Sequence, residues 1–386
     1  MPRTLIKRPQ GSSGVAVFSP DTLYVIFSKA MDSTSIDGKA LFTITPPVPI
    51  LAAHPVGNDF VSVLLALGRP LQADTVYSLT MKKGGADCAG IPLEDDHPIL
   101  FGLPQLTAPL DIVINEILSD PSKAGVKYVE LYNRSPRIED LKNLNLASLD
   151  SVSGAIVETK EICPASYLLF PGNYVVLSTN GQIVQSQYHS PNPDGFIDLP
   201  SMPKMNIGGG GIALVSTSGL IIDEVVYSAS WQFPLLLSTK GVSLERINYD
   251  KPTQDAGNWH SAAETVGFGT PAYRNSEYMT GVTDQDIILV DPVFSPDEDG
   301  HNDVLLIEYK LDAPDYLGTV QIFDSRGKLI KFLFSNLLLG IEGTLTWDGT
   351  RDNLEKGSNW PIHCIFSNLF RGWKKEGIQK SLYAGR

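Results

Sequence analysis

The sequence predicts an all-β protein built from β-sandwiches, and three observations lead to this fold class. Short runs of alternating or β-branched apolar residues recur along the chain, and no apolar stripe with helical spacing extends over a dozen residues. The 34 glycines and 27 prolines are spread between these runs, as tight turns between strands require. A hydrophobic content of 42% in 386 residues is enough for more than one core. The clearest predicted strands lie in TLYVIFS, FVSVLLAL, IVINEIL, YVVLST, GIALVST, LIIDEVVY and TVQIFD.

The first of these strands belong to a segment from about Gly14 to Leu103. In LQADTVYSL a turn leads into a strand, and strand alternation places Tyr77 and Leu79 on the face opposite to their neighbours. The stretches SPDTLYVIFSKAMDSTSI, FTITPP, FVSVLLALGRPLQADTVYSLTM and DCAGIPLED resemble the bacterial Ig-like domains of secreted and surface-layer proteins. That resemblance implies a β-sandwich that serves as a spacer.

The second segment, from about Leu110 to Ser276, carries the most specific series of motifs. IVINEILSDPSKAGVKYVELYNRSPRIEDLKNLNLAS is followed in order by FPGNYVVLSTN, NIGGGGIALVSTSGLIIDEVVYS, GVSLERIN, NWHSA and GTPAYRNS. The ordered series strongly resembles a lamin-tail domain, which implies an Ig-like β-sandwich. Bacterial members occur in extracellular multidomain proteins and are associated with binding or tethering rather than catalysis. Leu144 stands where the family often has Trp, a change that bears on packing.

The third segment runs from about Ile287 to Arg386. DPVFSPDEDGHNDVLLIEYKL, VQIFDSRGKLIKFL and GTLTWDGTRDN resemble FlgD-like Ig domains and the C-terminal domains of gliding-motility-associated proteins of Bacteroidetes. GSNWPIHCIF departs from the family pattern at the start of one strand. Such C-terminal domains can act as sorting signals for type IX secretion, so the resemblance implies an exported, envelope or surface protein.

Two short polar or proline-bearing stretches separate these segments, GLPQLTAPLD and YMTGVTDQD. We therefore expect three Ig-like β-sandwich domains in series. Their predicted boundaries are 1–107 for the bacterial Ig-like domain, 108–280 for the lamin-tail domain and 281–386 for the FlgD-like domain.

VFSPDEDGHNDVL, at the start of the third segment, is a candidate calcium loop. Read from its serine, the spacing brings Asp297, Asp299 and Asp303 to oxygen-ligand positions and Gly300 to the turn position of an EF-hand-like loop. Leu306 occupies the place of the closing bidentate Glu, and no flanking helix is predicted. The alternative, which we favour, is an Asp/Gly turn whose carboxylates accept local backbone amides. A catalytic carboxylate pair has less support, because no base or nucleophile stands nearby.

Other polar features have structural explanations that outweigh functional ones. The glycines Gly208–Gly211 precede a predicted hairpin rather than a helix, which favours a turn over a phosphate-binding loop. Glu116 and Glu130 lie within apolar strands, where we expect pairing with Arg, Lys or backbone at a sheet edge. His260, beside a tryptophan, is expected to pack at the edge of a core. None of the six histidines forms a local zinc motif.

Composition limits the compartment and the partners. The net charge of -13 disfavours a nucleic-acid partner. Cys88, Cys163 and Cys364 are too few and too far apart for a disulfide framework or a zinc set. The chain opens without an apolar signal-peptide core, and no run approaches the length of a membrane helix. The basic residues within 361–386 are expected on a solvated hairpin.

The function that this sequence predicts is non-catalytic. We expect an exported or cell-surface protein whose sandwiches serve adhesion, tethering or recognition, with a surface protein or a polysaccharide as partner. No cofactor is expected, apart from the calcium possibility. An alternative is the accessory, substrate-presenting part of a secreted hydrolase or nuclease. A self-assembling envelope component is a third possibility. No ligand can be named from the sequence.

Overall fold

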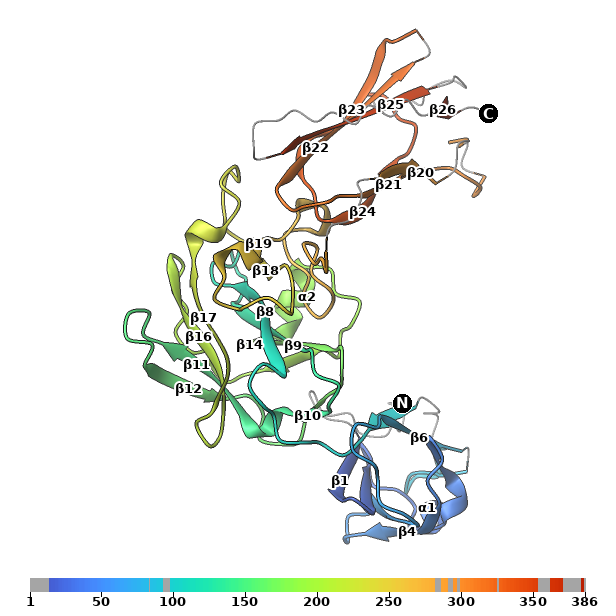
Figure 1. The fold of residues 1–386 in the computed structure, drawn as a ribbon. Coiled ribbons are helices and arrows are strands. Elements are labelled where there is room, and N and C mark those ends of the chain that lie inside the picture. The colour runs from blue at the N-terminus through green and yellow to red at the C-terminus, as the bar shows by residue number, and fades with distance from the viewer. Residues whose placement is uncertain are drawn as a thin grey trace.

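The computed structural model describes residues 14–82, 84–92, 98–281, 286–290, 294–296, 299–324, 326–352, 362–370 and 383–384, the last two ranges as backbone only. The chain is almost entirely β, which confirms the predicted fold class. Its sheets follow one another along a curved path, with the N-terminal part (β1–β7) and the C-terminal part (β20–β26) on either side of the middle part (β8–β19) (Figure 1).

The N-terminal part consists of two sheets that share one core. The first has the strand order β1-β2-β5-β4 and the second the order β3-β6-β7. In β6 the buried residues are Tyr77, Leu79 and Met81 and the alternate ones are half-exposed, which confirms the predicted alternation. The elements are β1 Val15–Ser19, β2 Thr22–Ile26, α1 Ser33–Ile36, η1 Lys39–Leu41, β3 Phe42–Thr45, β4 Ile50–Val56, β5 Ser62–Leu67, β6 Tyr77–Met81 and β7 Ile99–Phe101.

The middle part also places its main core between two sheets. A six-stranded sheet has the order β15-β14-β9-β8-β18-β19, and a four-stranded sheet has the order β12-β11-β16-β17. The strands of the six-stranded sheet are β8 Ile112–Leu118, β9 Tyr128–Asn133, β14 Tyr174–Ser178, β15 Phe196–Asp198, β18 Leu244–Arg246 and β19 Trp259–Ser261. Those of the four-stranded sheet are β11 Leu144–Leu149, β12 Ile156–Glu161, β16 Gly209–Ser216 and β17 Ile221–Ser228.

Shorter elements complete the middle part. The pair β10 Glu139–Asp140 and β13 Leu168–Leu169 forms a small sheet, and α2 Gly181–Gln187 is a helix that the sequence patterns did not predict. Asn180 caps this helix by accepting a hydrogen bond from the Ile183 amide. The 3-10 turns are η2 Leu141–Asn143, η3 Ala229–Trp231, η4 Ala256–Asn258 and η5 Glu264–Val266.

One edge of the four-stranded sheet is closed by the chain itself. The side-chain amide of Gln254 accepts a hydrogen bond from the Val226 amide (2.8 Å) and donates one to the Val226 carbonyl (3.1 Å). The Leu110 amide donates to the Ile222 carbonyl on the same strand, at 2.7 Å. Both outward backbone groups of Val226 and the carbonyl of Ile222 are therefore satisfied without another strand.

The C-terminal part again has two sheets around a core. Their orders are β20-β21-β24 and β23-β22-β25-β26. The core includes Ile307, Trp347 and Val320, which come from both sheets. The strands are β20 Asp286–Leu289, β21 Leu305–Lys310, β22 Tyr316–Asp324, β23 Leu329–Leu338, β24 Glu342–Trp347, β25 Ile362–Phe370 and β26 Tyr383–Ala384.

The N-terminal and middle parts meet through a short contact. A Cβ added at Gly102 would lie 2.8 Å from the Thr75 carbonyl oxygen and 2.2 Å from the terminal methyl group of Ile138, so the backbone contact favours glycine at this approach. The Gln105 amide donates to the Ile138 carbonyl, and the Gln105 side chain donates to Asp74.

The three parts have separate clusters of buried apolar side chains. The boundaries at 107/108 and 280/281 remain predictions.

Candidate functional site

A row of ionisable side chains crosses the six-stranded sheet of the middle part. Glu245 lies directly opposite His260 on one side and Glu116 on the other, and Glu116 lies opposite Glu130. The three glutamates have no exposed surface, and His260 is 4% exposed. Four adjacent strands thus place one histidine and three carboxyl groups side by side. We call His260, Glu245, Glu116 and Glu130 the ladder.

Strand alternation and one β-bulge bring the ladder to the face away from the main core. The flanking residues Ile117, Val129 and Leu244 point into the main core. The register of β8 against β9 shifts between Ile114 and Glu116, so that Asn115 is an extra residue. The side chain of Asn115 reaches the ladder, where it donates a hydrogen bond to Glu130 at 2.8 Å.

The segment 262–278, which we call the strap, covers the ladder and supplies most of its hydrogen-bond donors. The backbone amide of Thr270 donates to Glu116 at 3.0 Å, that of Ala272 to Glu130 at 2.5 Å, and that of Glu277 to Glu245 at 2.9 Å. Side-chain hydroxyls on the strap add two further bonds, from Thr270 and from Ser276 to Glu245.

The sheet itself contributes the remaining donors to Glu116. Tyr128 and Ser243 both donate to Oε1 of Glu116, at 2.7 and 2.5 Å. The sequence predicts that Glu116 and Glu130 pair with Arg, Lys or backbone at a sheet edge. Backbone amides are among their partners, together with neutral side chains, but β8 and β9 lie inside the six-stranded sheet rather than at its edge. The buried Arg246 instead pairs with Asp223 at 3.4 Å, and Thr253 bridges the two.

Burial raises the pKa of all three ladder glutamates. It raises the pKa of Glu116, and it raises that of Glu130 well above the usual range, with the charge of Glu116 acting in the same direction. Burial, followed by the charges of Glu116 and Glu277, raises the pKa of Glu245 to about 8. Carboxyl groups so close together share protons and titrate as one unit. Burial therefore favours the protonated, uncharged form of the three glutamates.

His260 extends the ladder to the C-terminal part. Its Nε2 lies 2.6 Å from Oδ1 of Asp315, and its Nδ1 lies 3.4 Å from Oε1 of Glu277. Burial alone would lower the pKa of His260, but the charges and hydrogen bonds of Glu277 and Asp315 outweigh burial and raise it to about 10. His260 is therefore an imidazolium that bridges two parts of the chain. The expectation of simple packing at a core edge missed this role.

Further contacts join the strap to the C-terminal part. The Ile341 amide donates to the Ser276 carbonyl at 2.8 Å, and Arg274 forms an ion pair with Glu342. A Cβ at Gly340 would lie 2.7 Å from the Ser276 carbonyl, which shows how closely the backbones approach. The strap thus has one face on the ladder and the other on β24 and its preceding turn.

A stack of tyrosines lies where the strap ends. The ring centroids of Tyr132 and Tyr249 are 4.0 Å apart, and those of Tyr249 and Tyr278 are 4.2 Å apart. Tyr174 joins the stack through its hydroxyl, which lies 2.7 Å from that of Tyr249. The stack holds the last strap residue against the middle part.

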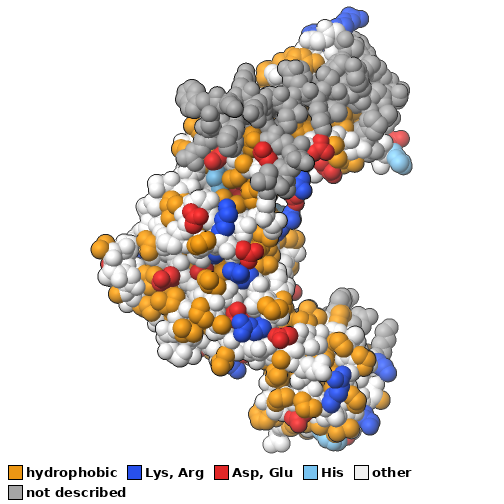
Figure 2. Space-filling model, viewed as in Figure 1, with side chains coloured by type: hydrophobic (Ala, Val, Ile, Leu, Met, Phe, Trp, Pro, Cys, Tyr) orange, Lys and Arg blue, Asp and Glu red, His pale blue; other side chains and the backbone are white. Residues whose placement is uncertain are grey.

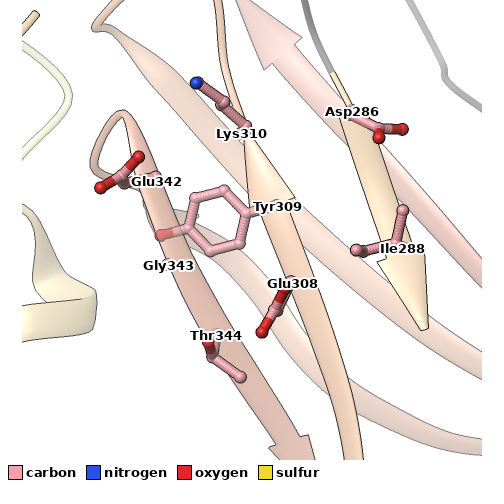
Figure 3. Close-up of a pocket in the computed structure, with 8 residues that line it drawn as sticks. All are labelled: Asp286, Ile288, Glu308, Tyr309, Lys310, Glu342, Gly343 and Thr344. Atoms are coloured by element: carbon pink, nitrogen blue, oxygen red, sulfur yellow. The ribbon is translucent and has the colours of Figure 1, made fainter. Parts of the chain in front are cut away.

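An open cleft of about 400 Å³ lies on the exposed face of the sheet β20-β21-β24 (Figure 3). One cross-strand row consists of Asp286, Lys310 and Glu342, and the next includes Glu308 and Thr344. These side chains present carboxylate, ammonium and hydroxyl groups to solvent. The face of the middle part seen in Figure 2 mixes acidic, basic and apolar side chains, with no extended basic patch in that view.

The predicted calcium loop is described only in part. Asp297 lies outside the described residues, whereas Asp299 accepts a hydrogen bond from the His301 amide at 2.7 Å and Asp303 one from the Gly300 amide at 2.8 Å. These contacts are those of the Asp/Gly turn. Within the described residues no group of three potential metal ligands is found. The calcium prediction stays a prediction.

The remaining sequence features have the following positions. Gly209 begins β16 with a φ of +142°, and a Cβ at Gly211 would lie 2.5 Å from that of Leu149, so close strand packing accounts for these glycines. Cys88 is an exposed free thiol and Cys163 a buried one. The side chain of Cys364 and the basic residues within 361–386 lie outside the described side chains. None of the described helices is long and apolar enough to cross a bilayer.

One family model matches a stretch of the chain that includes most strands of the middle part. Residues 105–229 match the family model described as Lamin Tail Domain. The match confirms the lamin-tail expectation over residues 105–229, which include β8 to β17, and the rest of the second segment remains a prediction. Glu245 and His260 lie beyond it, so the ladder combines two residues inside the match with two outside. The families expected for the N-terminal and C-terminal segments remain predictions.

No curated protein matches the chain. Among solved structures, the S-layer protein rSbsC(31-844) is 11% identical, with 99% of this chain and 54% of that chain covered and a TM-score of 0.23. A DUF4876 family protein from Bacteroides thetaiotaomicron is 12% identical, with 64% and 87% covered and a TM-score of 0.25. The chain thus spans about half the length of the S-layer protein. TM-scores this low do not establish a shared architecture or role.

Proposed function

We propose that the chain is a non-catalytic, exported or cell-surface protein whose β-sandwich parts serve adhesion, tethering or ligand recognition. The observation that carries the proposal is the serial arrangement of separate cores, with the middle and C-terminal parts joined by a partly buried ionic contact. Such an arrangement holds recognition surfaces at a set spacing. The lamin-tail match supports it, because the resemblance implies tethering rather than catalysis.

The buried polar groups support a structural role as well. The ladder carboxyls have no exposed surface, so no substrate reaches them in this conformation. Their hydrogen-bond partners are structural: backbone amides, hydroxyls and one asparagine. Buried ionisable groups with shifted pKa values are often catalytic, but here the ladder fastens a segment of chain.

The finer parts of the proposal follow from the sequence resemblances. The N-terminal part would be a bacterial Ig-like spacer, and the C-terminal part a FlgD-like domain of the type found in Bacteroidetes. The protein would then work at the outer surface or in the periplasm. Its partner would be a surface protein or a polysaccharide. The cleft on β20-β21-β24 fits the second choice, because Glu308, Lys310 and Thr344 can all hydrogen-bond to sugar hydroxyls.

A thermal-shift screen of the purified chain tests this function. The probes are soluble bacterial polysaccharides and calcium chloride up to millimolar concentration. A ligand that binds only the folded state raises the melting temperature, and we expect this with at least one polysaccharide. Lys310→Ala should weaken the shift, whereas Lys240→Ala, a change at an exposed lysine of the middle part, should not.

Two results bear against the proposal or its details. Hydrolysis of nucleic acid or glycan by the purified chain, lost on substitution of cleft residues, would replace it with the hydrolase alternative. A calcium-dependent shift that Asp299→Asn and Asp303→Asn abolish would establish the metal site, and an unchanged melting temperature at millimolar calcium would remove it.

A further inference from the structure

The strap and the ladder form a closure whose chemistry depends on protons. Three carboxyl groups in directly opposite cross-strand positions cannot all ionise at low cost, because their charges repel and no basic side chain of the described residues is hydrogen-bonded to Glu116 or Glu130. Closing the strap excludes water from them. In the closed state these carboxyl groups therefore need to hold protons. Once the strap opened to solvent, the same groups would ionise and release them.

Some buried carboxyl oxygens under the strap lack hydrogen-bond donors, which makes the closed state less stable than it could be. Oε2 of Glu116 and Oε2 of Glu277 are fully buried without a hydrogen-bond partner among the described residues, and Oε1 of Glu277 has the His260 Nδ1 at 3.4 Å as its ionic partner. Each such group adds a desolvation cost that opening would remove. The hydrogen bonds that the strap donates to the ladder therefore offset the desolvation cost of burying these oxygens.

Opening the strap would also disturb the junction, because the same residues serve both faces. Ser276 donates its hydroxyl to Glu245 and accepts the Ile341 amide through its carbonyl. Glu277 donates its amide to Glu245 and lies beside His260, which holds Asp315. Movement of the strap away from the ladder would therefore displace the residues that also contact the C-terminal part.

We propose that the strap is a proton-dependent latch: protons held by the ladder keep it closed, and their loss releases the strap together with the contact to the C-terminal part.

The other titratable groups around the ladder act in the same direction or remain neutral. Burial raises the pKa of Tyr128, Tyr188 and Tyr273, so these stay neutral at working pH. Burial also raises the pKa of Glu277, which His260 partly offsets. Among the described residues, the titratable and charged groups that face the ladder and the strap are Tyr128 on β9, Tyr174 on β14, Tyr188 after α2, Tyr249 after β18, Tyr273, Arg274 and Glu277 on the strap, and Tyr309, Asp315 and Glu342 in the C-terminal part.

The sign of the dependence follows from linkage. Glu245, with a folded pKa of about 8 against an ordinary value of 4.5, holds its proton in the closed state and loses it in the open state between these limits. Closure is complete at low pH and is lost as the pH rises through about 8. His260 acts likewise, because its imidazolium loses its charge only above a pKa of about 10.

Hydrogen exchange of the full chain tests the latch. Exchange of the amides of Thr270, Ala272 and Glu277, corrected for intrinsic rates, is measured from about pH 6 to pH 9. For each proton released on opening, the protection factor should fall about tenfold per pH unit. The peptide that contains Ile341 should lose protection with the same slope, whereas β16 should not. The closure is overturned if strap protection does not change with pH, and the coupling is overturned if Ile341 stays protected while the strap exchanges.

Variants separate proton binding from general stability. Glu245→Gln keeps the shape of the side chain and removes its titration, so the slope should become shallower. Glu224→Gln, at an exposed position of β17, should keep the wild-type slope. If Glu245→Gln does not fold, Glu130→Gln provides the same comparison, and the wild-type pH profile alone decides whether the latch exists. Equal slopes in wild type and both ladder variants would overturn the assignment to the ladder.

Discussion

Arg246 shows at the scale of one residue how the middle part tolerates a buried charge. It is 1% exposed, and its guanidinium donates to the Ile114 and Lys251 carbonyls and to Thr253, with Asp223 as counter-ion. Burial lowers the pKa of Arg246 and raises that of Asp223, while each charge opposes the shift of the other. Either charge, if it were buried without the other, would destabilise the folded protein.

Removing this cation should therefore be costly. We expect Arg246→Met to lower the free energy of unfolding of the middle part by roughly 3–5 kcal/mol, because Asp223 is left buried without a partner. Urea unfolding followed by tryptophan fluorescence measures the change. Adding Asp223→Leu should recover part of the loss. Lys240→Met, at an exposed lysine, is the control, and an equal loss in that variant would contradict the explanation.

The two described cysteines should differ sharply in reactivity. Burial raises the pKa of Cys163 to about 12, whereas Cys88 is exposed. Because the thiolate is the nucleophile, we expect iodoacetamide to modify Cys88 in the folded chain and Cys163 only after denaturation. Peptide mass spectrometry distinguishes the two sites. Modification of both at equal rates in the folded chain would show that the cover over Cys163 opens readily.

At the scale of elements, the glycine run before the β16–β17 hairpin provides a matched pair. A Cβ at Gly211 would lie 2.5 Å from the Leu149 Cβ and 2.9 Å from its carbonyl oxygen, whereas Gly208 has no atom within 4 Å. We expect Gly211→Ala to destabilise the middle part by about 1–3 kcal/mol and Gly208→Ala to have little effect. Thermal unfolding compares them, and equal melting temperatures would mean that β11 and β16 can move apart.

The ladder makes the stability of the middle part depend on pH. Its glutamates have folded pKa values above the ordinary 4.5, and that of Glu245 is about 8. Their contribution is fully present below the ordinary value and is lost as the pH rises through the folded one. We expect the free energy of unfolding to fall by about 1.4 kcal/mol per pH unit for each proton involved. Urea titrations at about pH 5.5, 7 and 8.5 measure this, and rising stability over that range would contradict it.

Local patterns in the sequence were enough to predict most strands and part of the site. The alternation in β6 and the apolar runs of β8 and β16 are set by residues adjacent in the sequence, so a sequence pattern reveals them. Acidic residues in apolar strands drew attention to Glu116 and Glu130. Glu245 and His260 gave no such signal, because the ladder arises only when four strands pair in register. The helix α2 has too few apolar residues in its seven to form a stripe.

At the scale of the whole molecule, the link between His260 and Asp315 joins residues 55 positions apart and fixes two parts of the chain against each other. No sequence pattern indicates a contact of this range. Asp315 has a φ of +75°, a conformation that Asn also tolerates, so Asp315→Asn removes the charge without backbone strain. This substitution isolates the ionic contribution to the junction.

We expect Asp315→Asn to loosen the junction while leaving both cores folded. Loss of a buried, charge-assisted hydrogen bond costs roughly 1–3 kcal/mol, so the C-terminal part should unfold at a lower temperature than the middle part. Calorimetry should show a wider separation of transitions, and small-angle scattering a larger maximum dimension. Asp352→Asn, at an exposed position, is the control. A variant indistinguishable from wild type in both measurements would show that other junction contacts suffice.

The amide of Gln254 has a consequence for how copies of the protein behave together. A side-chain amide has the same donor and acceptor groups as a peptide bond. The Gln254 amide therefore makes the two hydrogen bonds to β17 that a residue of a fifth strand would make, and the sheet ends there. Copies crowded side by side therefore find no template for hydrogen bonding at this residue. Gln254 acts as a terminator of sheet growth, and it favours discrete molecules over fibres along that side.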